Sequence, residues 1–407
     1  MKRIILSILS MMSMVTITMP TAQADDLFSS DRLSLHGFGT LGVSHLSNEN
    51  VDYKTNIQPS GPGGTYDVDF GLDSRLGVQL DYALTEHTTA TIQTISQRNT
   101  DRTFTPHVSL LNLRHEFDNG LAIRVGRIQP TTYLAAEYRL ANFSNPWVRP
   151  PEVVYGLVPL IEQQAIDVSY PFATEYGIFT GWLGVFKYDV DIGRINQSGT
   201  DTAKIRNGRN IGIKWQHGAW LAKAGWAIND TTLETAPLKA ALAGVGLFDP
   251  AAANALALNN TPVEVFSAGI TYEDSDWLMM AEWAARKSHS LLSDTWGAYV
   301  TVGRHLGPVL PYLTIGRQAI DDPSVTSSNP IASQIINQIY KSTNFSQWAA
   351  SIGMSYPIQE KAILKFQIDW IKPDNGSTGP YTNVSAGYDS SHPPTDILIS
   401  VNLDFIF

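Results

Sequence analysis

The sequence predicts an all-β protein, a transmembrane antiparallel β-barrel of about sixteen strands. Apolar residues recur at every second position in one segment after another, which is the period of a strand. After residue 24, no uninterrupted apolar run is long enough to cross a bilayer as a helix. Strands that cross a membrane must close into a barrel, because an open edge would leave unpaired backbone groups in lipid.

The first 24 residues have the pattern of a cleaved signal peptide. Lys2 and Arg3 precede an apolar run over residues 4–19, and Ala22-Gln23-Ala24 supplies a small-residue cleavage site. The alternative is an uncleaved anchor, which the short run and the well-placed site disfavour. We expect one barrel domain over residues 25–407.

The composition excludes several classes of protein. The 407 residues include no cysteine, which excludes disulfide scaffolds and thiolate metal sites. The formal net charge is -10 and no basic block occurs, which argues against nucleic acid as a partner. The nine histidines are dispersed, and neither a His-x-x-x-His nor a Gly-x-Ser-x-Gly motif is present. The sequence therefore supports no metal site and no enzyme, and it implies no cofactor.

Five strands are expected in the first third of the chain. In the first of them, Leu41 and Val43 lie on one face and Thr40 on the other. Asp118-Asn119-Gly120, before the fifth strand, is a hairpin signal because Asn and Gly tolerate positive φ. The five expected strands are residues 32–44, 70–82, 88–97, 107–117 and 121–128.

Eleven further alternating segments follow, and short turns alternate with long connections between them. This asymmetry predicts short periplasmic turns and long extracellular loops, with both termini on the periplasmic side. The further strands are residues 165–170, 176–188, 210–216, 219–228, 263–272, 277–287, 295–303, 309–318, 345–356, 362–372 and 396–407. The long connections are residues 45–69, 129–163, 189–208, 229–261, 319–343 and 373–395.

The last strand carries the first family resemblance. Residues 396–407 are apolar at every second position and end on Phe407. This segment resembles the carboxyl-terminal signature of bacterial outer-membrane β-barrels. The resemblance implies that the barrel-assembly machinery recognises Phe407 as an assembly signal. It also implies export through the periplasm to the outer membrane, with outer-membrane lipid and lipopolysaccharide as partners.

Aromatic residues gather at strand ends beside the short turns, where amphipathic rings prefer the lipid–water boundary. The alternative is a soluble β-sandwich, which has no reason to place aromatic residues by turn length. The residues of this expected periplasmic girdle are Tyr82, Phe117, Tyr170, Trp215, Trp220, Tyr272, Trp277, Tyr356 and Phe407.

One long connection, residues 129–163, follows the fifth strand and is rich in aromatic, charged and proline residues. By this ordinal position the mature chain resembles the general porin family, which consists of sixteen-stranded barrels with an inward-folded third loop. The resemblance implies a homotrimeric, water-filled channel for passive diffusion of ions and small hydrophilic solutes. Residues 48–64 of the first loop are long enough to clasp a neighbouring subunit.

The resemblance also implies a constriction, where arginines on the wall face carboxylates on the inserted loop. Facing charges in a narrow passage create a transverse field that biases ions by sign. The loop lacks the family's Pro-Glu-Phe-Gly-Gly stretch and carries arginines of its own, which leaves the sign of ion selectivity open. The candidate pore-lining residues are Arg75, Arg114 and Arg124 on the wall, and Glu137, Arg139, Arg149 and Glu152 on the loop.

Each candidate arginine has an alternative role. It would brace the wall in a salt bridge inside the lumen, with Asp73, Glu116 or Asp167 as its partner.

Other functions also remain as alternatives to the passive channel. A substrate-selective channel for anionic or sugar-like solutes would use loop aromatics as a stacking track beside Arg139 and Arg149. An outer-membrane enzyme such as a lipase or protease would show turnover, and an adhesive barrel would show no conductance. The aromatic residues of the track are Tyr133, Tyr138, Trp147 and Tyr155.

Two further patterns have simple explanations. Residues 37–42 match Gly-x-Gly-x-x-Gly but lie inside the first strand, so we expect these glycines to permit bending and not to bind a nucleotide. Residues 240–258 are rich in Ala and Leu, but Asp249-Pro250 interrupts them. We expect a loop with a short helical turn there.

Overall fold

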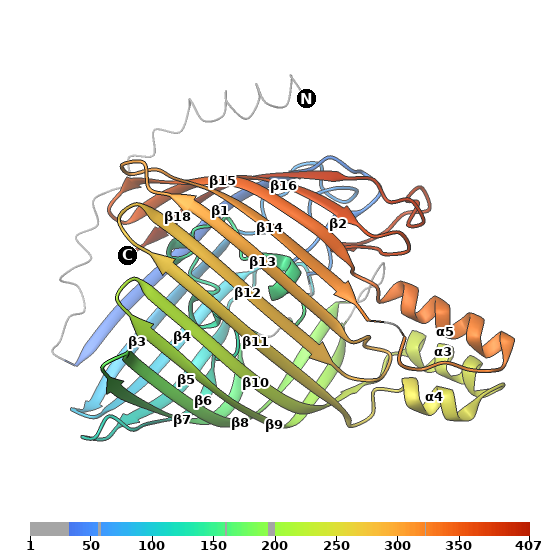
Figure 1. Cartoon of the computed structure of the whole chain (residues 1–407), viewed down its shortest axis with the longest axis horizontal. Coiled ribbons are helices and arrows are strands. Elements are labelled where there is room, and N and C mark those ends of the chain that lie inside the picture. Colours follow the sequence, from blue (N-terminus) through green and yellow to red (C-terminus); the bar gives the residue numbers. More distant parts are fainter. Residues whose placement is uncertain (1–31, 56–57, 159–160, 194–199, 322) are drawn as a thin grey trace.

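The computed structural model describes residues 32–55, 58–158, 161–193, 200–321 and 323–407, and the predicted signal peptide lies outside the described residues. Sixteen strands form a closed antiparallel barrel, as predicted (Figure 1). The last strand, β18, pairs with the first and so closes the barrel. The strands are β1 Leu33–Leu46, β3 Arg75–Thr85, β4 Thr88–Gln97, β5 His107–Glu116, β6 Ala122–Ile128, β7 Gln163–Thr174, β8 Gly177–Gly193, β9 Thr200–His217, β10 Trp220–Leu233, β11 Thr261–Glu273, β12 Trp277–Lys287, β13 Thr295–Arg304, β14 Leu310–Ile320, β15 Gln347–Gln359, β16 Ala362–Pro373 and β18 Asp396–Ile406.

The two ends of the barrel differ. Short turns, such as residues 218–219, join the strands at one end, which we call the short-turn rim. Long connections join them at the other end, the long-loop rim. The C-terminus lies at the short-turn rim, and the helices α3, α4 and α5 project from the long-loop rim (Figure 1). The predicted alternation of short and long connections is therefore present.

Several predicted strand boundaries were wrong, and two regions differ most. β3 begins at Arg75, so residues 70–74 belong to the preceding loop. β8 and β9 extend through most of the predicted connection 189–208. Polarity inverts in this extension: Asp189 and Asp191 are exposed, whereas Val190 and Ile192 are partly buried. Charged residues on the outer face gave the segment the appearance of a loop, although the period of two continues.

The outer face of the barrel is apolar, with exposed side chains such as Leu41, Leu113 and Ile211. Outward glycines of β1 lie beneath aromatic rings of β18. A Cβ atom on Gly37 would lie 2.0 Å from the Phe407 ring, and one on Gly39 would lie 2.3 Å from the Phe405 ring. The glycine-rich pattern of the first strand thus makes room for neighbouring rings.

Three helices form a lobe on the long-loop rim, which we call the helical lobe: α3 Ala236–Gly246, α4 Pro250–Leu256 and α5 Pro330–Ser342. The predicted interruption is present, because Asp249 caps α4 by accepting a hydrogen bond from the Ala252 amide at 3.0 Å. The expected loop with a short helical turn was wrong, since two helices form on either side of the interruption. Val245, Leu256 and Ile336 pack together between the helices. Within the described residues, no helix has the length and apolar character needed to span a membrane.

The first loop folds onto its own barrel. Its short strand β2, Asp52–Tyr53, pairs with β17, Tyr381–Thr382, in the last loop. Val51 and Tyr53 are buried together with Leu398. Because these side chains are buried within the chain, this part of the first loop is held against its own barrel. A clasp of a neighbouring subunit by residues 48–64 stays a prediction.

Candidate functional site

The connection between β6 and β7 enters the barrel, as expected for an inward-folded third loop. It contains two 3-10 turns, Ala136–Tyr138 and Asn142–Ser144, and the helix α2, Glu152–Tyr155. This inserted loop packs against the inner faces of β11 to β14 in one apolar cluster. The principal side chains of that cluster are Tyr133, Trp147, Val153 and Tyr155 of the loop and Val265, Leu278, Tyr299 and Tyr312 of the wall.

A glycine allows the loop to approach the wall closely. A Cβ atom on Gly297 of β13 would lie 1.8 Å from the Val153 carbonyl oxygen. Any other side chain at this position would collide with the loop backbone, which cannot move without displacing α2. The close contact between α2 and the wall thus depends on the absence of a Cβ atom at Gly297.

Hydrogen bonds fix the loop to buried polar groups of the wall. The Trp147 indole donates to the hydroxyls of Thr301 and Thr314 at 3.0 and 3.2 Å. The Glu282 carboxylate accepts from the Leu134 amide at 2.7 Å and from the Tyr155 hydroxyl at 2.8 Å. Burial raises the pKa of Tyr155 well above its usual value, so its hydroxyl retains the proton that it donates.

Arg149 is the most extensively paired residue of the inserted loop. It donates to Asp73 at 2.6 Å and to Asp369 at 3.3 Å, and its side chain is 5% exposed. It also donates to the hydroxyls of Ser44 and Ser400. Burial acts to lower the pKa of Arg149, but Asp73, Tyr53 and Asp369 together outweigh it and the pKa is raised. Arg149 therefore anchors the loop to the seam between the first and last strands.

A lysine provides a second anchor on the same side. Lys365 of β16 is fully buried, donates to the Asn145 carbonyl at 2.6 Å and lies 2.9 Å from the Asp404 carboxylate. Each buried charge is paired, as a low-dielectric interior requires. Together with Arg149, these contacts hold the loop against one side of the lumen.

The acidic residues of the loop have different surroundings. Glu137 is 53% exposed and lies 3.5 Å from the Lys223 ammonium of β10. Glu152 begins α2, where its negative charge is near the buried Arg139. Arg139 donates to the Tyr155 carbonyl at 2.9 Å and stacks over the Tyr155 ring. Among the loop candidates, Glu137 is therefore the best placed to meet solvent in the lumen.

The three wall arginines do not form one cluster. Arg114 and Arg124 are cross-strand partners near the short-turn rim. Arg114 is aligned with Thr89 of β4, whereas Arg75 is aligned with Gln97 of the same strand. These positions are eight residues apart, or roughly 26 Å at the rise of a strand.

The two arginines near the short-turn rim form the salt bridges inside the lumen that were considered as their alternative role. Arg114 lies 2.6 Å from Glu116, and Arg124 lies 2.6 Å from Asp167. Arg75 donates to the Asp73 carbonyl at 3.2 Å, near the loop. Only Arg75 of the three is thus close to the inserted loop.

Lys223 is a site residue that the sequence analysis missed. It lies opposite Glu137, is 4% exposed at its side chain, and stacks over the Trp182 ring at 5.4 Å. Lys223 lies on the inward face of β10, between the apolar Leu221 and the glycine at 225. A charged residue at an inward position of the strand pattern is a signal that could have identified it. Sequence parity alone does not show which loop residue it meets.

Two cavities lie toward the long-loop rim. One of about 550 Å³ has a lining that is about equally polar and apolar, and Arg75, Arg98, His107 and Glu162 contribute to it. Burial raises the pKa of Glu162 to about 7, and Arg127, at 3.5 Å, opposes this shift. The other cavity, of about 290 Å³, is mostly apolar. Tyr188 and Val190 border both cavities.

No protein-family model matches the sequence, and no curated protein matches it in sequence. Solved structures do match in fold. The anion-selective porin from Comamonas acidovorans is 13% identical, with a TM-score of 0.53 over 92% of this chain and 99% of that one. The outer membrane channel DcaP of Acinetobacter baumannii is 12% identical, with a TM-score of 0.54 over 93% and 99%. Salmonella typhi OmpF, in complex with daunomycin, is 10% identical, with a TM-score of 0.55 over 92% and 97%. The chain therefore has the fold of the outer-membrane porins, a closed antiparallel barrel of sixteen strands.

Proposed function

We propose that the protein is a porin of the bacterial outer membrane, a water-filled channel for passive diffusion of ions and small hydrophilic solutes. The observation that carries the proposal is the closed barrel with an apolar outer face and a loop anchored inside it. Such a barrel satisfies every backbone group in lipid and leaves its inner face for water. No chemical step belongs to this function.

The selective part of the channel is the space beside the inserted loop. Glu137 on the loop and Lys223 on the wall form an ion pair of 3.5 Å at its border, with the Glu137 carboxylate the more exposed of the two. Arg75, Arg139 and Glu152 add charge on the side toward the long-loop rim. Arg114 and Arg124 line the lumen nearer the short-turn rim. Charges arranged in this way bias ions by sign.

The test is single-channel conductance of the refolded mature protein in a planar bilayer under a KCl gradient. Stable steps with a nonzero reversal potential would support the channel, and the sign would report which charges dominate. Silence from protein shown to be folded by circular dichroism and heat-modifiable gel mobility would overturn the proposal.

The proposal includes a route of assembly. Residues 1–24 are removed as a signal peptide, the chain crosses the periplasm, and the barrel-assembly machinery recognises Phe407. What supports a special role for Phe407 is its place at the closure, since its amide and carbonyl exchange hydrogen bonds with Gly37 at 3.0 and 2.9 Å. Deletion of Phe407 should leave the protein in the periplasm, as measured by fractionation. Normal insertion of the deletion variant into the outer membrane would contradict the role of Phe407 as an assembly signal.

A homotrimer in contact with lipopolysaccharide is also part of the proposal. Exposed apolar side chains on the outer face support either lipid or subunit contacts there. Conductance steps in groups of three and cross-linked trimers would support the homotrimer. A single conductance level and a monomeric mass by light scattering would contradict it.

The second candidate function is a substrate-selective channel. The observation that favours it is the apolar cavity of about 290 Å³ beside the lumen, which a channel for water and ions alone does not need. Saturable block of the current by one class of solute would distinguish it from the general channel.

A further inference from the structure

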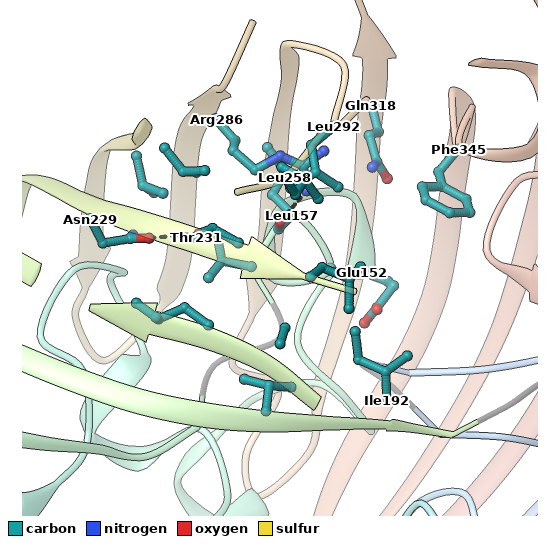
Figure 2. Close-up of a pocket in the computed structure, with 18 of the residues that line it drawn as sticks. Glu152, Leu157, Ile192, Asn229, Thr231, Leu258, Arg286, Leu292, Gln318 and Phe345 are labelled. Carbon is teal, nitrogen blue, oxygen red and sulfur yellow. Dashed lines mark hydrogen bonds between the residues drawn. The ribbon is translucent and has the colours of Figure 1, made fainter. Parts of the chain in front are cut away.

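The apolar cavity lies inside the barrel toward the long-loop rim, between the inserted loop and the ends of β8 to β11 (Figure 2). Its volume of about 290 Å³ is near the lower end of the range for small-molecule pockets. Its wall is mostly apolar, and the barrel strands contribute the aliphatic side chains of Val190, Ile192, Ala203, Ile205, Val263 and Val265. Water forms no hydrogen bonds with such a wall, whereas an apolar solute buries the surface of these side chains away from water.

The pattern of polarity along β8 makes this cavity a built feature, because the inward face stays apolar from Trp182 and Phe186 to Ile192 while the outward face becomes charged. In the membrane part of the strand, the outward residues Leu183 and Val185 are apolar and exposed. Beyond Phe186 the outward residues are the exposed Lys187 and Asp189, and apolar residues point inward. A channel for water and ions alone would have polar residues on its inner face. This segment instead presents an apolar surface to the lumen.

The helical lobe completes the outer wall. Leu233, Leu258 and Leu292 line the cavity, and each also packs with the apolar cluster of α3, α4 and α5. The lobe thus holds these three leucines in place. Its packing gives the cavity a defined shape where a long loop would otherwise move.

Two cations border the cavity without carboxylate partners. Arg286 donates to the Leu157 carbonyl at 2.8 Å and to the Ser293 carbonyl and the Thr295 hydroxyl, each at 3.3 Å. Its Nε is buried without a hydrogen-bond acceptor. The Lys54 ammonium lies over the Phe345 ring at 5.6 Å. Within the described part of the chain, neither cation has a carboxylate within the distance of an ion pair. Glu152 is the one acid in the lining, so the described wall has a net positive charge.

Figure 2 shows how these groups are arranged. Arg286 lies among Leu157, Leu258 and Leu292, while Phe345 and Gln318 lie to one side of it. Apolar side chains lie beside the buried guanidinium, where an attraction between charges is weakly screened. An anion bound here would meet a charge-assisted donor and an apolar wall together.

We infer that this cavity binds an organic anion with an apolar body, of the size of a bicyclic aromatic carboxylate. The carboxylate would be held by Arg286 and Lys54, and the apolar body would lie against the aliphatic wall of β8 to β11. This inference rests on the proposed channel, because the solute would enter the site from the lumen. Binding there would select such anions among the solutes that the channel admits.

The test uses sodium 2-naphthoate with the refolded protein in lipid nanodiscs, measured by isothermal titration calorimetry against empty nanodiscs. The subtraction removes any partition of the probe into lipid. Saturable binding is expected for 2-naphthoate, at least tenfold weaker binding for the neutral 2-naphthamide, and none for acetate. Equal affinity for the acid and the amide would overturn the role of the cations.

Matched variants test the site itself. Arg286→Gln and Ile192→Gln should each weaken 2-naphthoate binding at least tenfold. Arg304→Gln, at the short-turn rim, and Val384→Gln, in an exposed loop, are the controls and should leave binding unchanged. If Arg286→Gln does not fold, Lys54→Gln in the first loop tests whether a cation of the lining holds the carboxylate. Unchanged binding in both cation variants would overturn the inference.

KCl conductance of the same preparation separates this inference from the proposed function. Conductance without saturable 2-naphthoate binding would overturn the site and leave the channel intact. Saturable binding without conductance would support the site and overturn the channel. Saturable binding together with block of the current at the same concentrations is the result we expect.

Discussion

Arg149 of the inserted loop and Asp73, two residues before β3, lie 2.6 Å apart, and both side chains are almost completely buried. They join the middle of the third long loop to the wall at the point where the barrel closes. Removing one partner of a buried ion pair leaves an uncompensated charge and costs about 3–5 kcal/mol. This pair is therefore expected to control both the stability of the barrel and the position of the loop.

Replacing Asp73 with Asn tests that expectation. We expect the free energy of unfolding to fall by about 3–5 kcal/mol in urea titrations of the refolded protein. The channel current should also become noisy, since the loop is released from the seam. Asp189→Asn removes half of an exposed pair, with Arg206, and should cost only about 0–1 kcal/mol. Equal effects of the two substitutions would contradict the anchoring role.

Gly297→Ala tests the close contact of the loop with β13. The added methyl group would meet the Val153 carbonyl, so α2 must move. Overpacking of this kind costs about 1–3 kcal/mol, and the displaced loop should change the single-channel conductance. The control is Gly181→Ala, whose methyl group would have no neighbour within 4 Å. A normal conductance in Gly297→Ala would show that the loop does not border the current path.

Glu137→Gln should shift ion preference toward anions. The substitution removes the half-exposed carboxylate and leaves the Lys223 ammonium opposite it without an ionic partner from the loop. The reversal potential in a KCl gradient measures the shift. Glu360→Gln, in an exposed turn at the short-turn rim, should leave that potential unchanged. A shift toward cations in Glu137→Gln would contradict this assignment.

The double substitution Arg114→Ala and Arg124→Ala should shift ion preference toward cations. It removes two positive charges and leaves the carboxylates of Glu116 and Asp167 in the lumen. An unchanged reversal potential would show that the current does not pass close to this wall.

Ion preference should depend on pH near neutrality through Glu162. Its pKa is raised to about 7 by burial, so the carboxyl is mostly neutral at pH 6 and mostly charged at pH 8. At pH 6 the nearby Arg127 is uncompensated, and the reversal potential should indicate greater anion preference than at pH 8. Glu162→Gln should remove this dependence. If the dependence persists in the variant, another group is responsible, and His107 in the same cavity is the next to test.

The type of architecture follows from local properties of the chain. A period of two is a local property of the chain, and it shows in segments such as residues 88–97, which match β4 at both ends. Turn chemistry at Asp118-Asn119-Gly120 is equally local, and Gly120 has the expected positive φ of 84°. The place of the inserted loop after the fifth strand suggested the family resemblance, and that resemblance implied that the loop folds inward.

The tertiary structure decided which residues meet. Arg75, Arg114 and Arg124 share inward parity, but strand register separates the first from the other two by eight residues. Arg149 was expected to line the pore and is an anchor instead, because closure of the barrel brings Asp73, Asp369 and Ser400 together around it. The apolar cavity also depends on the whole barrel, since Lys54, Arg286 and Phe345 of its lining are distant in sequence. Local period sets the face of each side chain, whereas register and closure set its neighbours, and these depend on the whole chain at once.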